Sequence, residues 1–84
     1  MTTFQAALIK EQGITFVVVS VQDSVINSPQ EAAEVISAMS LRFQCPAVLM
    51  GAHSHATRGR RDLVQFLSHV HISRFPWRQW GMAA

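Results

Sequence analysis

The chain has 84 residues, of which 49% are hydrophobic and only 14% are charged, and its net charge is +2 when the histidines are neutral. This composition excludes a disordered chain, because disorder requires low hydrophobicity and many charges. The length suits one α/β domain over residues 1–84, and the apolar excess suggests that a second subunit covers part of the surface.

The charges are unevenly distributed along the chain. Residues 1–42 carry two basic against four acidic side chains, whereas residues 43–84 carry five arginines against one aspartate. Arginine suits planar anions such as phosphate and carboxylate. A basic face without a ligand is also consistent with this pattern.

One cysteine, Cys45, excludes a disulfide within the chain and is typical of a reducing compartment. No apolar run is long enough to span a membrane. We therefore predict a cytoplasmic location and no membrane contact.

The first predicted elements are a strand pair. Residues 2–12 fit either a short helix or a strand that returns through a tight Gln12–Gly13 turn. We favour the hairpin, because the β-branched run Ile14–Val21 follows the glycine directly. This run is apolar at both alternating sets of positions, which predicts a central strand buried on both faces.

A helix follows, and its start is the clearest local signal in the sequence. Ser28 fits the N-cap position, Pro29 the first helical position and Glu31 the third. Apolar residues then recur at helical spacing until Pro46 ends the helix. Residues 46–52 predict a second buried strand.

The remaining elements are a loop, a helix and a last strand. Residues 53–59 are polar and predict a loop, and apolar residues at i, i+3, i+4 and i+7 predict a helix over residues 63–70. Residues 75–82 predict a final strand, placed at an edge or starting at Pro76. Trp77 and Trp80 should then face opposite sides, one in the core and the other available to a partner or half-exposed.

The predicted fold is a small mixed β-sheet with two helices in the order ββαβαβ, and its crossover makes the two buried strands parallel. If both helices cover one face, the other face of Ile14–Val21 needs a cover, and a homodimer is the simplest one. If the helices cover opposite faces, the argument for a dimer weakens.

The predicted site is the rim where parallel strands end, since ligands in open α/β sheets bind there. Polar residues follow the two buried strands, and arginines stand at the start of the next helix, whose free amides favour anions. The candidate ligand-binding residues are Asp23, Ser24, His53, Ser54, His55, Arg58, Arg60 and Arg61.

Three chemistries compete for this rim. The first is an anion or phosphate site, although no glycine-rich phosphate loop is present. The second is a metal site on His53 and His55, which has too few ligands unless Asp23 supplies a third. The third is hydrolysis by Ser24 or Ser54, which no nucleophile-elbow motif frames. A polar loop that binds no ligand is a better explanation of these residues than any one of the three chemistries. The sequence implies no cofactor.

Two function classes follow from this sequence. The leading one is a non-enzymatic, homo-oligomeric binding module with a basic rim for a small anionic ligand or partner. Nucleic acid is a weaker version of this partner, because the total charge is low and no aromatic surface accompanies the arginines. The alternative is a small enzyme that uses His53 or His55 as its acid–base group.

Overall fold

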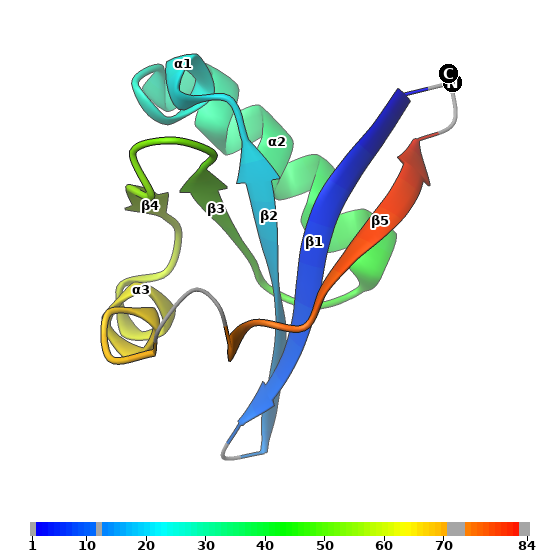
Figure 1. Cartoon of the computed structure of the whole chain (residues 1–84), viewed down its shortest axis with the longest axis vertical. Coiled ribbons are helices and arrows are strands. Elements are labelled where there is room, and N and C mark those ends of the chain that lie inside the picture. The colour runs from blue at the N-terminus through cyan, green and yellow to red at the C-terminus, as the bar shows by residue number, and fades with distance from the viewer. Residues whose placement is uncertain (1, 12, 71–73, 83–84) are drawn as a thin grey trace.

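The structure is a computed structural model that describes residues 2–11, 13–70 and 74–82. Five strands of these residues form a sheet in the order β4-β3-β2-β1-β5, in which β2 and β3 are parallel and the other neighbours antiparallel (Figure 1). The elements in chain order are β1 (Thr2–Glu11), β2 (Ile14–Val21), α1 (Asp23–Ile26), α2 (Pro29–Phe43), β3 (Ala47–Gly51), β4 (Thr57–Arg58), α3 (Arg61–Leu67) and β5 (Trp77–Met82).

This mixed sheet with its helices confirms the predicted fold class and element order. The N-terminal segment is a strand rather than a short helix, because β1 pairs with β2 from Ala6↔Val19 to Glu11↔Ile14. That register leaves two residues for the turn. Gly13 has a φ of 77°, which glycine adopts without steric cost, whereas Gln12 lies outside the described residues.

The first predicted helix begins where its sequence indicates. Ser28 is the N-cap of α2, its hydroxyl accepts a hydrogen bond from the Glu31 amide at 3.4 Å, and Pro29 opens the helix. The helix ends at Phe43, followed by Gln44 in the left-handed conformation. Local capping chemistry therefore sets the helix start.

Two short elements were not predicted. The helix α1 has four residues, and the strand β4 has two residues inside the predicted loop over residues 53–59. A four-residue helix and a two-residue strand each span about one period of the helical or strand pattern of apolar residues, so hydrophobic periodicity does not reveal them. The helix α3 also ends at Leu67, three residues before the predicted end.

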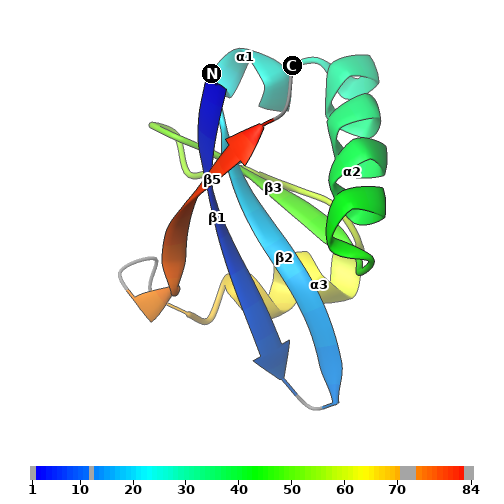
Figure 2. The same ribbon diagram turned by 90° about the vertical axis from the view of Figure 1, so that its right-hand side faces the viewer.

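Both faces of the sheet are covered. On one face of the sheet, Val17, Val19 and Leu49 belong to a core cluster with residues of α1 and α2. On the other face, Phe16 and Val18 belong to a second cluster with residues of α3. Figure 2 shows α2 running along one side of the sheet. The helices therefore lie on opposite faces, and β2 has no open face that a second subunit must cover.

The two tryptophans of β5 confirm their predicted opposite orientations, and β5 is an edge strand that starts directly after Pro76. Trp80 packs edge-to-face on Phe43 with ring centroids 5.0 Å apart, and Trp77 lies against Phe75 at 5.7 Å. Both indoles are half-buried against a core cluster. A half-exposed position was one of the two alternatives predicted for the tryptophan outside the core.

Two leucines allow a matched test of this packing. Leu49 is 0% exposed and Leu41 is 79% exposed. We expect Leu49→Ala to lower the free energy of unfolding by about 2–5 kcal/mol, because it opens a cavity between the sheet and α2. Leu41→Ala should leave it nearly unchanged. Urea unfolding followed by circular dichroism measures both, and similar losses for the two variants would contradict the structure.

Candidate functional site

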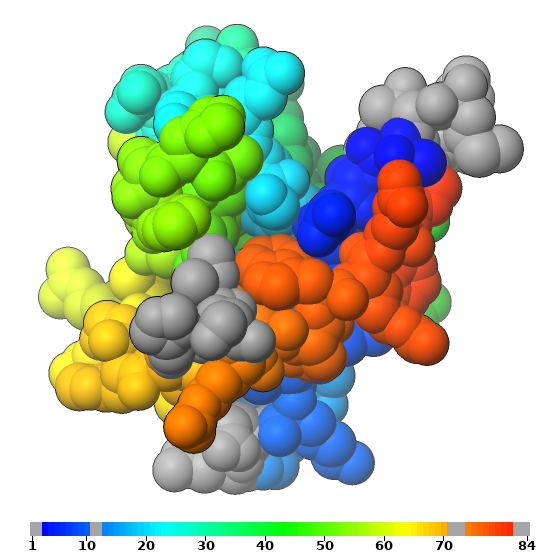
Figure 3. Space-filling model, in the orientation of Figure 1, coloured from blue at the N-terminus to red at the C-terminus, as the bar shows by residue number. Residues whose placement is uncertain are grey.

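The carboxyl ends of β2 and β3 lie next to each other, as the parallel register Val21↔Gly51 shows. The segments that follow these strands therefore meet. Figure 3 shows the turn after β3 in contact with α1 near the top of the molecule. The structure brings Asp23 of α1 together with His53 and Ser54 of the turn.

Asp23 connects these two segments through three hydrogen bonds. Its Oδ1 accepts from the backbone amides of His53 at 3.3 Å and Ser54 at 3.2 Å, and from the Ser54 hydroxyl at 3.1 Å. The Ser54 amide is the main cause that lowers the pKa of Asp23 below its ordinary value. The carboxylate is therefore ionised at neutral pH, where it holds the turn against α1.

The turn itself is tight. The His55 amide donates to the Gly51 carbonyl at 3.0 Å, and the Gly51 amide donates to the Ala56 carbonyl at 2.8 Å. A Cβ atom at Gly51 would lie 2.4 Å from Asp23 Oδ1 and 2.5 Å from Ser54 Oγ. Glycine is therefore required for the close approach of these two side chains.

The other polar candidates at this rim are exposed. Ser24 lies on α1, and His53 and His55 lie in the turn. Within the described part of the chain, none of these three side chains makes a hydrogen bond. Ser54 also accepts from the Ala56 amide at 3.2 Å, so its hydroxyl serves the turn at both its donor and its acceptor positions.

Of the three arginines, Arg58 is hydrogen-bonded to α1 at this rim, whereas Arg60 and Arg61 make no hydrogen bond to the rim residues within the described part of the chain. After the turn, β4 runs antiparallel to β3, so that Thr57 pairs with Met50 and Arg58 with Leu49. A Cβ atom at Gly59 would lie 3.1 Å from the Val48 side chain. The chain thus runs back along β3 and carries the arginines toward the amino end of that strand.

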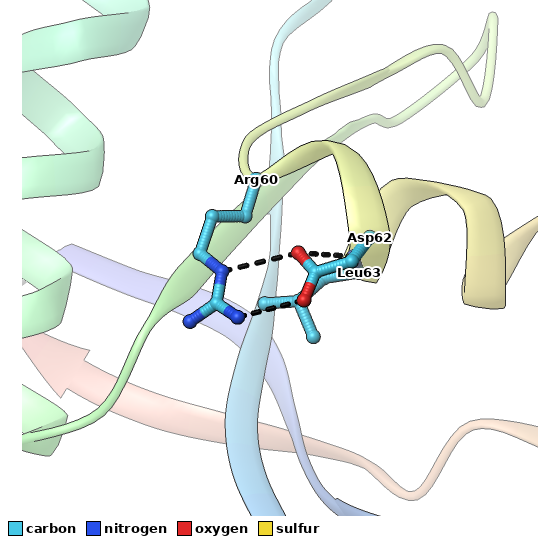
Figure 4. A network of polar contacts seen from close by, with 3 residues as sticks. All are labelled: Arg60, Asp62 and Leu63. Carbon is cyan, nitrogen blue, oxygen red and sulfur yellow. Dashed lines mark hydrogen bonds and ion pairs between the residues drawn. The ribbon is translucent and has the colours of Figure 1, made fainter.

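Each arginine has a different local environment. Arg58 is half-buried, and its Nε donates to the Ile26 carbonyl at the end of α1. Arg60 forms a two-bond ion pair with Asp62, at 3.0 and 2.7 Å (Figure 4). Arg61 is exposed and has no hydrogen-bond partner among the described residues.

The start of α3 also differs from the prediction of free amides that favour an anion. Asp62 Oδ1 accepts from the Leu63 amide at 3.0 Å. The Arg60 guanidinium is the main cause that lowers the pKa of Asp62. The chain therefore supplies its own anion at this helix start, and this anion in turn binds Arg60.

The three arginines line a hollow of about 580 Å³ along the outer side of β4. We call it the arginine groove. One wall is apolar and comes from α2, and the other comes from the start of α3. The lining residues are Pro29, Ala32, Ala33, Ile36, Thr57, Arg58, Gly59, Arg60, Arg61 and Val64.

Comparison with models of known protein families, with curated proteins and with solved structures finds no match to this chain.

The described residues contain no group of three or more His, Cys, Asp or Glu side chains that could hold a metal ion. Burial raises the pKa of the Cys45 thiol, which disfavours the nucleophilic thiolate. None of the described helices has the length and apolar character needed to cross a bilayer.

Asp23 gives a testable pH dependence. Because its pKa is lower in the folded protein than the ordinary value of 3.8, its contribution to stability is complete above that value and is lost as the pH falls through the folded pKa. Asp23→Ala should therefore lower the urea midpoint at pH 7, and the gap to the wild type should narrow as the pH drops below 4. Glu34→Gln, which alters an exposed side chain on α2, is the control. A gap that stays constant down to pH 2 would contradict this role.

Proposed function

We propose that this chain is a non-enzymatic binding module that takes an anionic partner in the arginine groove. The observation that carries the proposal is the composition of the groove lining, which includes three arginines, an apolar wall and no acidic residue. Ligand-binding hollows of a few hundred Å³ commonly combine apolar walls with a few polar groups that fix orientation.

The free donors of the arginines support this assignment. A guanidinium has five N–H donors. Arg58 uses its Nε for the Ile26 carbonyl, Arg60 uses two nitrogens for Asp62, and Arg61 uses none within the described residues. Arg61 is therefore the arginine most available to carboxylate or phosphate oxygens.

Arg61→Ala tests the groove against the rest of the basic surface. The matched control is Arg78→Ala, because Arg78 is also exposed but lies on β5 at the opposite edge of the sheet. With tripolyphosphate as the probe, amide NMR titration should place the shifts at residues 57–64. Arg61→Ala should weaken binding roughly three- to tenfold, since one charge-assisted contact is lost.

Equal losses for the two variants, or shifts spread over both edges, would contradict a site in the groove. Titration with a single-stranded oligonucleotide at several salt concentrations separates nucleic acid from a small anion. A steep loss of affinity with salt would identify nucleic acid, since neutralised phosphates release counterions.

The homodimer also remains a proposal, and the structure changes the surface on which it depends. Both faces of β2 are covered, so the apolar composition needs no second chain to explain it. Two large apolar side chains remain exposed in the β1–β2 hairpin, Leu8 at 42% and Ile14 at 40%. They lie on opposite faces, because Leu8 pairs with Val17 whereas Ile14 shares the face of Phe16. We propose that two hairpins meet through the Leu8 face.

Light scattering on a sizing column tests this dimer. Wild type should elute as a dimer at high concentration, and Leu8→Lys should shift it to a monomer. Leu41→Lys, on the exposed side of α2, should leave the mass unchanged. A wild-type monomer at every concentration would exclude the dimer.

The enzymatic alternative depends on the turn after β3. There the Ser54 hydroxyl is bound to Asp23, and the His53 and His55 side chains are exposed. No observation favours a reacting group at this turn, so we favour the binding module. The cytoplasmic location remains a prediction from the single cysteine and the short apolar runs of the sequence.

A further inference from the structure

We propose that the arginine groove binds an extended acidic segment of a partner protein, which adds to the sheet as a strand beside β4. This inference rests on the proposed function and specifies its partner. Its first support is the position of β4, which is the last strand of the sheet and, among the described residues, pairs only with β3.

The backbone of β4 offers hydrogen-bonding groups to such a strand. The Gly51 amide donates to the Ala56 carbonyl, and Met50 pairs with Thr57. In an antiparallel ladder this pattern makes Met50 and Thr57 a pair without mutual hydrogen bonds. The Thr57 N–H and C=O therefore point away from β3, toward the outer edge where an added strand would lie.

The walls of the groove match the alternation of a strand. Successive side chains of an extended segment point to opposite sides. On one side the groove offers Ala32, Ala33 and Ile36 of α2, and on the other it offers the start of α3 with Arg61 and Val64. One set of side chains can therefore pack on an apolar wall while the other reaches a basic one.

Charge selects the occupant. Arg58 and Arg61, which have no carboxylate partner among the described residues, favour acidic side chains, whereas the charge of Arg60 is offset by Asp62. The same arginines disfavour a second copy of this chain paired edge to edge through β4, because like charges would face each other. None of the lining residues is aromatic, whereas single-stranded nucleic acid is commonly held by stacking on aromatic rings. An acidic peptide uses the open backbone edge, the apolar wall and the charges together.

The probe is a fluorescein-labelled eight-residue peptide of alternating valine and glutamate, measured by fluorescence anisotropy. Two further versions carry N-methyl groups on every valine or on every glutamate. Strand addition requires the backbone N–H groups of one set. We expect one N-methylated version to bind at least tenfold more weakly than the parent, and a lysine–valine peptide not to bind.

The protein variants test the same hydrogen bond from the other side. Thr57→Pro removes the outward N–H, and an edge strand tolerates proline at such a position. Thr57→Val keeps this N–H. We expect Thr57→Pro to weaken peptide binding at least tenfold while tripolyphosphate still binds, and Thr57→Val to bind like the wild type. Circular dichroism checks the fold of both, and the N-methylated peptides decide the question if Thr57→Pro does not fold.

The failures are distinguishable. If both N-methylated peptides bind as well as the parent, or the parent does not bind while tripolyphosphate does, strand addition is wrong and the anionic site stands. If an oligonucleotide binds the groove more tightly than the peptide, the partner class is wrong. If no anion binds, the proposed function fails as well.

Discussion

The burial of β2 on both faces is the constraint on which the rest of this structure depends. Phe16, Val17, Val18 and Val19 are at most 2% exposed, and they alternate between two core clusters. A strand of this kind requires a cover on each side, and α2 and α3 supply it. The helices must therefore lie on opposite faces, and the high apolar content follows from two cores rather than from one core and an interface.

The positions of the polar residues follow from the parallel pair at the centre of this sheet. Because β2 and β3 end at the same rim, Asp23 can accept hydrogen bonds from the turn after β3. That attachment fixes the direction in which the chain leaves the rim. The chain then returns along β3 as β4, and the Arg58 guanidinium is bound to the end of α1. The Asp23 contacts thus position the strand that borders the arginine groove.

The sequence was informative where local chemistry and periodicity decide the structure. The Ser28 cap, the two-residue hairpin turn and the doubly apolar run Ile14–Val21 were each readable, because each depends on residues close in the chain. The meeting of Asp23 with His53 and Ser54 was also readable, since parallel strands end at one rim. The tryptophans were placed on opposite sides by the period of a strand.

The arginines could not be placed by the same reasoning. Their position depends on β4, a two-residue pairing between segments that local propensity treats as loop. The glycines Gly51 and Gly59 are compatible with close approaches in residues 51–59, but the sequence does not say which residues approach them. Nor does it show that Asp62 would take the amide at the start of α3. The β4 pairing comes from tertiary packing, which overrides local pattern, whereas the Asp62 contacts join residues only one and two positions apart in the chain.

Since helices cover both faces of the sheet, its backbone can be reached by another chain only at the two edge strands. These two edges differ in how far side chains cover them. At the β5 edge, Arg42 reaches from the last turn of α2 and donates to the Gly81 carbonyl at 2.6 Å, while its guanidinium lies 5.1 Å from the centroid of the Phe4 ring. The Arg42 side chain thus partly covers the β5 edge.

At the β4 edge, the Arg58 side chain donates instead to the Ile26 carbonyl of α1. It therefore does not bind the outward N–H and C=O groups of Thr57. A long open edge would invite aggregation. An edge of two residues flanked by arginines limits that risk, because like charges disfavour a second copy while an acidic strand remains attractive.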